Sequence, residues 1–189
     1  MKNNPKEVIV ISGGFDPVHS GHISYIQEAR KNGDYLVALL NSDEWLIRKK
    51  GKYFLPFEER KIILENLKYI DEVLGFEDDE LGSCIEGLKK IKAIYPNSKI
   101  IFCNGGDRQK ENIPEMSLKG INFKFGIGGN NKKNSSSSIL KEWTYEKEDR
   151  VWGTFYNLFL DKNIKVKELI ISPNQGMSFQ RHFHRNEIW

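Results

Sequence analysis

The chain has 189 residues, with 29 Lys and Arg against 26 Asp and Glu, which gives a formal net charge of +3. Hydrophobic residues make up 39% of it and charged residues 29%, a composition that supports a folded core and excludes a wholly disordered chain. The longest aliphatic run, Val8-Ile9-Val10-Ile11, is too short to cross a bilayer, and the first residues lack the apolar stretch of a signal peptide. Because there are only two cysteines, in no C-x-x-C pair, and the chain is only mildly basic, we expect a cytoplasmic protein that binds neither membranes nor nucleic acid.

Strand-like and helix-like segments alternate over the first 145 or so residues. Short apolar runs predict strands at 7–11, 35–40, 72–76, 99–103 and 122–125. Helical spacing predicts helices from 19 to about 31, from Pro56 onwards, from 81 to 95 and near 137–143. In the second of these we expect Ile63, Leu67 and Ile70 to form the buried stripe, and in the third Leu81 to share a face with the apolar residues that follow it. This alternation predicts an α/β protein with a doubly wound, five-stranded parallel sheet.

The character of the chain changes near residue 146. A charged run at 146–150 precedes β-type segments at 155–160, 166–171 and 176–189, and turn residues separate them at 161–163 and 172–174. We therefore predict two domains, an α/β domain over residues 1–145 and a short all-β segment over 146–189.

All four histidines fall in two close pairs, His19 with His22 and His182 with His184. The first pair lies where the first strand passes into the first helix, and its three-residue spacing puts both imidazoles on one side of a helical turn. Gly13 and Gly14 before the pair and Gly21 within it allow an anion to approach the backbone, while the free amides of a helix start attract phosphate. The alternative is a helix whose first turn carries histidines without a ligand. The combination favours a polyphosphate site.

The run Gly14-Phe15-Asp16-Pro17-Val18-His19-Ser20-Gly21-His22 resembles the H-x-G-H signature of the cytidylyltransferase-type nucleotidyltransferase superfamily. It is similar to the glycerol-phosphate cytidylyltransferases and to the adenylyltransferase part of the bacterial heptose-phosphate enzymes, over about residues 8–142. The resemblance implies a Rossmann-like fold of the nucleotidylyltransferase type. It also implies transfer of CMP or AMP from a nucleoside triphosphate to a sugar- or polyol-phosphate, with release of pyrophosphate.

The resemblance further implies roles for single residues. His19 and His22 would be catalytic, stabilising charge on the phosphates most strongly as cations. Lys49, Lys50 and Arg60 would bind the acceptor phosphate, the two lysines from a substrate-side loop over 41–51. The nucleotide would contact Gly13, Gly14, Phe15, Asp16, Gly21, Gly105, Gly106, Asp107, Ser135, Ser136 and Ser137. Mg²⁺ would enter with the triphosphate, and the family implies a homodimer. An Arg that the family carries beside its last hydroxyl-rich segment is missing here, where Lys132 or Lys133 offers only a point charge.

The second histidine pair suggests a metal site. His182 and His184 are two residues apart and would face the same way on a strand, with Glu187 three residues on. Two imidazoles and a carboxylate form a common ligand set for a divalent transition metal. Residues 176–189 resemble the first metal motif of cupins, as found in type II mannose-6-phosphate isomerases, with the run 150–153 as an opening element. The alternative is an incomplete cupin strand that another chain completes.

Three functions are compatible with the sequence. The leading one is a sugar- or polyol-phosphate nucleotidyltransferase, which the run Asn104-Gly105-Gly106-Asp107 favours. The second is an adenylyltransferase acting on pantetheine phosphate or nicotinamide mononucleotide. The third is a non-catalytic nucleotide- or metal-binding module, which the missing Arg favours.

Overall fold

A computed structural model describes residues 5–106, 108–109, 113–129, 136, 139–140, 145–178 and 188. The chain forms two compact units, residues 1–139 and 140–189, and each is treated separately below.

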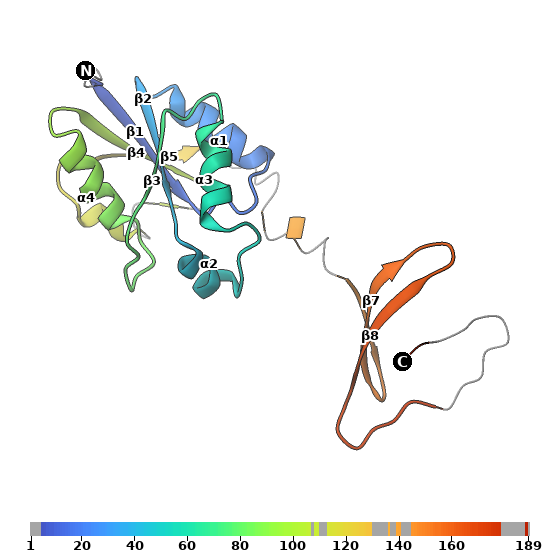
Figure 1. Ribbon diagram of the computed structural model, residues 1–189. Helices are drawn as coiled ribbons and strands as arrows, with labels where there is room; N and C mark the ends of the chain where they lie inside the picture. The colour runs from blue at the N-terminus through green and yellow to red at the C-terminus, as the bar shows by residue number, and fades with distance from the viewer. Residues whose placement is uncertain are drawn as a thin grey trace. The chain divides into compact units, whose positions relative to one another are not determined.

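The first unit is built on a five-stranded parallel sheet in the order β3-β2-β1-β4-β5 (Figure 1). Its strands are β1 (Glu7–Gly13), β2 (Tyr35–Leu40), β3 (Glu72–Gly75), β4 (Lys99–Gly105) and β5 (Asn122–Ile127). Its helices are α1 (Ser20–Arg30), α2 (Asp43–Lys50), α3 (Phe57–Glu65) and α4 (Ile85–Ile94), with a short 3₁₀ turn, η2 (Pro114–Ser117). The central position of β1 places its carboxyl end between β2 and β4, where the strand order reverses and α/β sheets bind their ligands. The predicted α/β, doubly wound sheet is confirmed.

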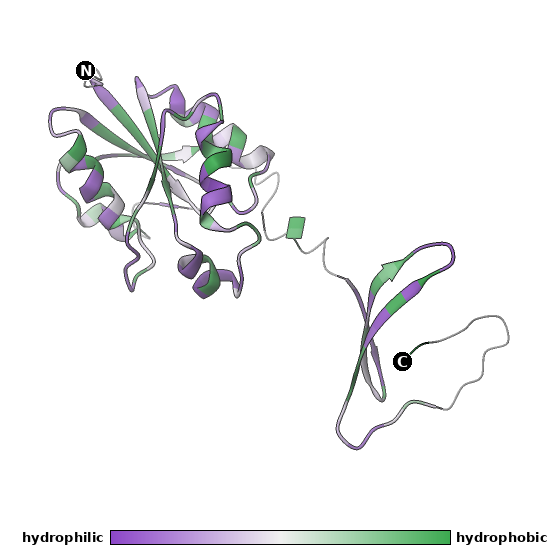
Figure 2. Cartoon of the chain, viewed as in Figure 1, coloured by the Kyte–Doolittle hydropathy of each residue, from purple (hydrophilic) through white to green (hydrophobic). Residues whose placement is uncertain are grey.

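Two apolar layers hold the sheet. One face of β1, with Ile9 and Ile11, packs against α1 and α3, and the other face, with Val8 and Val10, packs against α4. Figure 1 shows α4 on one side of the sheet and α1 and α3 on the other. Alternate residues of the central strands are buried on opposite faces, so β1 is apolar from Val8 to Ile11, and Figure 2 shows the middle of the central strands in green. The helices carry both colours, since each buries only one side.

Three local predictions are wrong. The stretch 43–50 forms helix α2 instead of a loop: Ser42 caps its start by accepting the Trp45 amide, and Gly51 ends it in the left-handed region. Helix α3 ends at Glu65, so Leu64 is its buried apolar residue, while Leu67 and Ile70 pack against the core from beyond the helix.

The third difference concerns the start of α4. Leu81 is 73% exposed, because the helix begins only at Ile85, after a loop. The helix buries Leu88 and Ile91 instead. The apolar stripe of α4 therefore does not include Leu81, which the sequence pattern predicted as its first residue.

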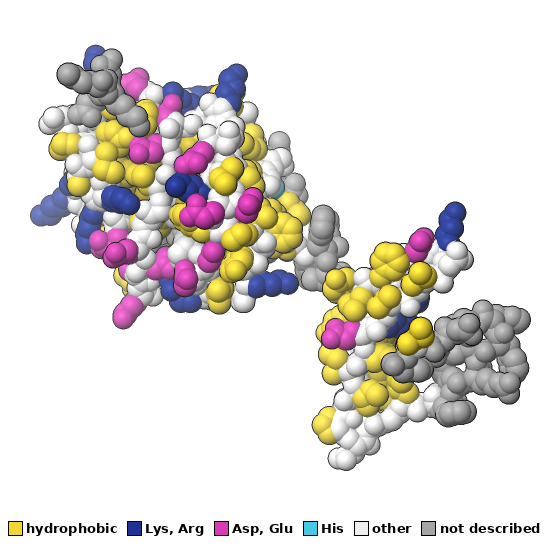
Figure 3. Space-filling view, viewed as in Figure 1, with side chains coloured by type: hydrophobic (Ala, Val, Ile, Leu, Met, Phe, Trp, Pro, Cys, Tyr) yellow, Lys and Arg dark blue, Asp and Glu magenta, His cyan; other side chains and the backbone are white. Residues whose placement is uncertain are grey.

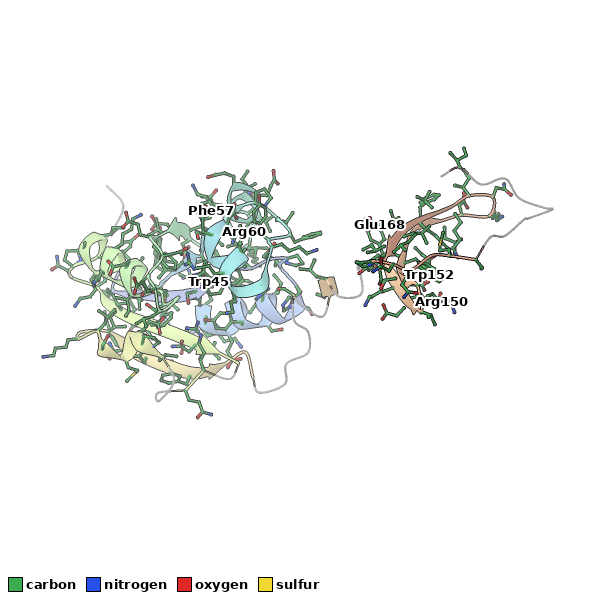
Figure 4. The ribbon with its side chains drawn as sticks, turned by 90° about the horizontal axis from the view of Figure 1, so that it is seen from below. Trp45, Phe57, Arg60, Arg150, Trp152 and Glu168 are labelled. Carbon is green, nitrogen blue, oxygen red and sulfur yellow. The ribbon has the colours of Figure 1, made fainter. Side chains whose placement is uncertain are left out.

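The second unit is a three-stranded antiparallel sheet in the order β6-β7-β8. The strands are β6 (Glu146–Arg150), β7 (Gly153–Leu160) and β8 (Lys165–Ile171). Among its described residues only Phe155, 5% exposed, is buried; Lys167 lies over its ring at 3.8 Å, and Trp152 stacks beside it. Figure 4 labels Arg150, Trp152 and Glu168 on this sheet, and Figure 3 shows hydrophobic side chains gathered over its described part. Residues 176–178 are not in a strand, contrary to the β-type prediction for them.

Candidate functional site

The loop from β1 to α1 is shaped by close packing at its glycines. A Cβ at Gly14 would lie 2.7 Å from Leu46 Cδ2 on α2, so a larger residue here would force the Leu46 side chain to move. Phe15 follows with a positive φ of 48°, and its buried ring meets the ring of His22 edge-on at 5.0 Å. Phe15 thus forms a wall of the histidine site. Gly13 ends β1 and Gly14 begins the loop, where it packs against α2.

Asp16 is part of the framework of the site. Its buried carboxylate accepts the backbone amides of Phe54 and Leu55, both at 2.8 Å. Its carbonyl oxygen accepts Lys50 Nζ at 3.2 Å. Since both carboxylate oxygens are engaged with backbone, the direct nucleotide contact predicted for Asp16 does not fit this arrangement. The residue instead fixes the segment before α3 against the histidine loop.

The two imidazoles of the first pair lie together. His19 is the N-cap of α1, where its Nδ1 accepts the Gly21 amide at 3.1 Å, so the helix begins at Ser20. The rings of His19 and His22 stack with centroids 3.9 Å apart and planes inclined by 29°. Because Nδ1 of His19 is an acceptor, the neutral ring carries its proton on Nε2 and presents a donor there. His22 Nδ1 is buried and has no hydrogen-bond partner among the described residues.

Both histidines are held neutral before a ligand binds. The pKa of His22 is lowered to about 3, first because burial disfavours the cation and then because His19 and Lys50 lie close. The pKa of His19 is also lowered, by burial and then by Lys50. The rings can therefore act as cations only with the ligand bound, because at neutral pH they become protonated only when added negative charge raises their pKa.

The two lysines of α2 differ in position. Lys50 is half-buried against Asp16 and close enough to both histidines to act on their pKa values; burial lowers its own pKa. Lys49 places its ammonium 4.2 Å from the ring centroid of Trp45. The structure thus brings Lys50 to the histidine pair, while it sets Lys49 over an aromatic ring of its own helix.

Arg60 is 0% exposed, and its guanidinium bonds to groups of the protein interior. Its guanidinium donates to the carbonyls of Leu55 and Asn41 at 2.9 and 3.0 Å. It also donates to the Gly14 carbonyl at 2.7 Å and to Asp43 Oδ1 at 2.6 Å. Figure 4 shows it on the same helix as Phe57, with Trp45 on α2. This burial contradicts the predicted contact with a substrate phosphate. Arg60 positions the loop and α2 instead.

Two distant segments meet the histidine loop. Ser136, buried, donates its hydroxyl to the Pro17 carbonyl at 3.1 Å. Gly105 ends β4 where a Cβ would lie 2.8 Å from the Ile127 carbonyl and 3.0 Å from the ring of Tyr25 on α1; Gly106 follows with a positive φ of 67°. Ser136 thus contacts the loop before α1, and the end of β4 packs closely beside that helix. The calls on Asp107, Ser135 and Ser137 lie outside the described residues.

The predicted metal ligands His182, His184 and Glu187 also lie outside the described residues. Among the residues that are described, no group of three His, Cys, Asp or Glu side chains could hold a metal ion. None of the described helices is long and apolar enough to span a membrane.

Sequence reasoning missed Glu115, a buried carboxylate on η2 that accepts the Cys84 amide at 2.9 Å. Its only sequence signal is an acidic residue after a proline, which more often marks an exposed turn. Asn104 was noticed only as part of a glycine-containing run, and it is buried at the carboxyl end of β4.

Comparison with known proteins gives two family matches. Residues 10–143 match the model "Cytidylyltransferase-like", and residues 139–189 match "Mannose-6-phosphate isomerase C-terminal". The Bifunctional protein HldE of Shigella sonnei is 37% identical over 153 residues, which cover 76% of this chain and 29% of that protein. The HldE protein of Salmonella arizonae matches to the same extent. This chain thus spans less than a third of the length of these relatives.

Among solved structures, the lipopolysaccharide core biosynthesis protein of Thermoplasma volcanium is 24% identical, with a TM-score of 0.46 over 64% of this chain and 93% of that one. A putative nicotinate-nucleotide adenylyltransferase of Vibrio parahaemolyticus is 19% identical, with a TM-score of 0.47 over 72% of this chain and 85% of that one.

Proposed function

Because the chain belongs to the cytidylyltransferase-like family, we propose that its first unit transfers a nucleotidyl group, CMP or AMP, from a nucleoside triphosphate to a sugar- or polyol-phosphate. The observation that carries the proposal is the stacked pair His19 and His22 at the start of α1, beside Lys50. These groups form a compact site at the carboxyl end of the central strand, and the imidazoles become cationic when the polyphosphate binds. The match to HldE supports the sugar-phosphate side of the family.

The reaction needs an anionic nucleophile and stabilised charge. An oxygen of the acceptor phosphate attacks the α-phosphorus and forms a P–O bond, while the bond from that phosphorus to the β-phosphate oxygen breaks and pyrophosphate leaves with the electron pair. A phosphate monoester has its second pKa near ~6, so the nucleophile is already ionised at neutral pH and no general base is required. The protein's part is to position two anions and to stabilise negative charge on the transferring group.

Three residues of the site have defined parts in this scheme. His19 presents Nε2–H to the phosphates, because its Nδ1 is held by Gly21. The partly buried His22 takes up a proton as the polyphosphate arrives and then donates to the α-phosphoryl oxygens or the leaving group. Lys50 adds a fixed charge beside both rings. Mg²⁺ would arrive with the triphosphate substrate and would offset part of its negative charge.

The test is pyrophosphate release from CTP and ATP with a panel of acceptors: glycerol 3-phosphate, hexose and heptose 1-phosphates, phosphopantetheine and nicotinamide mononucleotide. We expect turnover with a sugar- or polyol-phosphate. His22→Ala should lower the rate about 10²–10³-fold, as the loss of one charge-stabilising donor does. The matched control is Gln27→Ala, on an exposed position of the same helix, which should keep full activity. Nucleotide binding without turnover on any acceptor would favour the binding module, and full activity of His22→Ala would overturn the mechanism. The homodimer stays a prediction, which light scattering of the purified chain tests.

A further inference from the structure

Arg108 lies where the sheet changes its strand order. It follows the carboxyl end of β4, and β4 and β1 are the neighbouring strands at which the order reverses. Open α/β sheets bind their ligands in the crevice outside the carboxyl ends of the strands at such a point. The chain leaves β4 through Gly106, where no described atom lies within 4 Å of the position of a Cβ. The backbone before Arg108 therefore borders open space at the ligand-binding end of the sheet.

Interactions from both faces of the sheet place the charge of Arg108 near the end of β1. Ser12 of β1 interacts through its backbone with the Tyr25 hydroxyl and through its side chain with the Cys84 thiol. Tyr25 belongs to α1 on one face of the sheet, and Cys84 precedes α4 on the other. Burial raises the pKa of both groups, and the charge of Arg108 opposes the rise in both. A cation that acts on both groups lies at the edge where the two faces meet, beside the end of β1.

Tyr25 also relates Arg108 to the histidine pair. It lies three residues after His22 on α1, so the two side chains project from the same side of adjacent turns. The Tyr25 hydroxyl donates to the Cys103 carbonyl at 2.5 Å, which ties this side of α1 to the strand that leads to Arg108. The histidines and Arg108 therefore border the same region, the histidines from the start of α1 and Arg108 from the end of β4.

The guanidinium of Arg108 is held by a buried carboxylate but is itself accessible. The Arg108 side chain is 36% exposed, whereas that of Glu115 is 1% exposed. Nη1 lies 3.8 Å from Glu115 Oε1, a distance that fits an ion pair but is too long for a hydrogen bond. The same Oε1 accepts the Cys84 amide at 2.9 Å, which fixes Glu115 at the start of α4. Unlike the fully buried Arg60, Arg108 thus offers N–H donors to a ligand at the carboxyl edge.

An arginine at this place favours a polyphosphate, because its planar fork of N–H donors matches phosphate oxygens. Lys50 lies on the other side of the histidines, on the helix that follows β2, so one cation flanks the pair on each side. We propose that Arg108 binds the phosphates of the nucleoside triphosphate beyond the α-phosphate, while Lys50 faces the acceptor phosphate. This inference rests on the proposed function and assigns the two anionic substrates to the two sides of the histidine pair.

The test measures the binding of nucleotides that differ only in the number of phosphates. CTP and ATP, each with its di- and monophosphate, are bound to the full chain in equilibrium dialysis with Mg²⁺ and without an acceptor. In Arg108→Met the triphosphate should bind about 10- to 100-fold more weakly, the range expected for a hydrogen bond between charged groups, while the affinity for the monophosphate should change little. The preference for three phosphates over one should therefore shrink by a similar factor. In turnover, KM for the triphosphate should rise and KM for the acceptor should stay unchanged.

Further variants separate a phosphate contact from a structural ion pair. Arg108→Met leaves the buried Glu115 without its cation, so a double variant that also carries Glu115→Gln removes the pair without an unpaired buried charge. It should show the same loss of phosphate preference. Glu115→Gln alone keeps the guanidinium and should keep the preference. The matched control is Arg30→Met, which removes an arginine of similar exposure that pairs with Asp71 at the last residue of α1; nucleotide affinity should not change.

Two results would overturn the inference. One is an equal loss of affinity for tri-, di- and monophosphates in Arg108→Met, which a distortion of the fold would produce. The other is an unchanged affinity for the triphosphate in the double variant. In both cases the unaltered chain still releases pyrophosphate, and the proposed function stands. Absence of turnover with every acceptor would instead overturn the proposed function, while the affinity series would still decide whether Arg108 binds phosphate.

Discussion

Arg60 donates to the carbonyl of Gly14 at 2.7 Å, and this bond joins helix α3 to the loop that carries the histidine pair. The same guanidinium bonds Asp43 at the start of α2, so one buried cation positions both segments that bear site residues. Arg60 therefore affects the reaction only by positioning the histidine loop and α2.

The first prediction follows from this burial. Arg60→Met removes the cation and leaves the Gly14 and Asn41 carbonyls without their donor. We expect the free energy of unfolding to fall by about 3–5 kcal/mol, the cost of breaking a buried ion pair from one side. Urea denaturation followed by fluorescence measures it.

A matched control is Arg48→Met, which removes an arginine that is bonded to Asp78 but half exposed. It should cost less than about 1 kcal/mol, as solvent-exposed pairs do. Equal stability of Arg60→Met and the unaltered chain would show that the guanidinium is not a structural element, and would return it to the list of substrate contacts.

The second prediction concerns acid stability. Folding lowers the pKa of His22 from 6.5 to about 3 and lowers that of His19 as well, so the unfolded chain binds more protons below pH 6.5 than the folded one. Stability is therefore complete above about pH 6.5 and declines as the pH falls toward 3. The interval from pH 6.5 to 5 isolates the histidines, because the carboxylates titrate lower.

Urea titrations at pH 7 and pH 5 measure this decline. His22→Asn should be less sensitive to pH than the unaltered chain over this interval, since asparagine has no proton to exclude. An equal loss of unfolding free energy between pH 7 and pH 5 in the two proteins would mean that the His22 ring is free to protonate in the folded state.

How much of this site the sequence could predict depends on the range of the interactions. The H-x-G-H run lies within one connection, so local spacing was enough to predict that His19 and His22 lie on the same side at the start of the helix; their stacking is seen only in the structure. Helix α2 was missed although its signals were present: a Ser cap, acids in its first turn and bases in its last. The resemblance to the family's substrate-side loop favoured a loop over these residues.

Long-range burial was harder to predict. The role of Arg60 depends on carbonyls from two other segments, and nothing in the run 56–60 distinguishes a buried arginine from a phosphate ligand. Glu115 meets the Cys84 amide at the start of α4 only because η2 packs there. These contacts lie in the tertiary structure, beyond the reach of periodicity or spacing.

The third prediction links nucleotide binding to protonation. Because the free rings are neutral near pH 7 and polyphosphate charge raises their pKa, binding of a preformed Mg²⁺–triphosphate complex should take up protons from the buffer. Calorimetry in two buffers with different ionisation enthalpies should give binding heats that differ in proportion to this uptake. His22→Ala should bind with reduced dependence on the buffer. Equal heats in both buffers for the unaltered chain would contradict a proton-loaded His22.

The fourth prediction concerns the C-terminal segment, whose match to the mannose-6-phosphate isomerase model covers residues 139–189. His182, His184 and Glu187 offer a donor set that suits zinc or nickel, with two neutral imidazoles and one carboxylate. We expect the purified full chain to contain such a metal by mass spectrometry and His182→Ala to lack it. His22→Ala, which alters the other histidine pair, should retain the metal, so the comparison assigns the ion to one end of the chain. Metal that persists in His182→Ala but disappears in His22→Ala would place the ion in the first unit and leave the C-terminal histidines without this role.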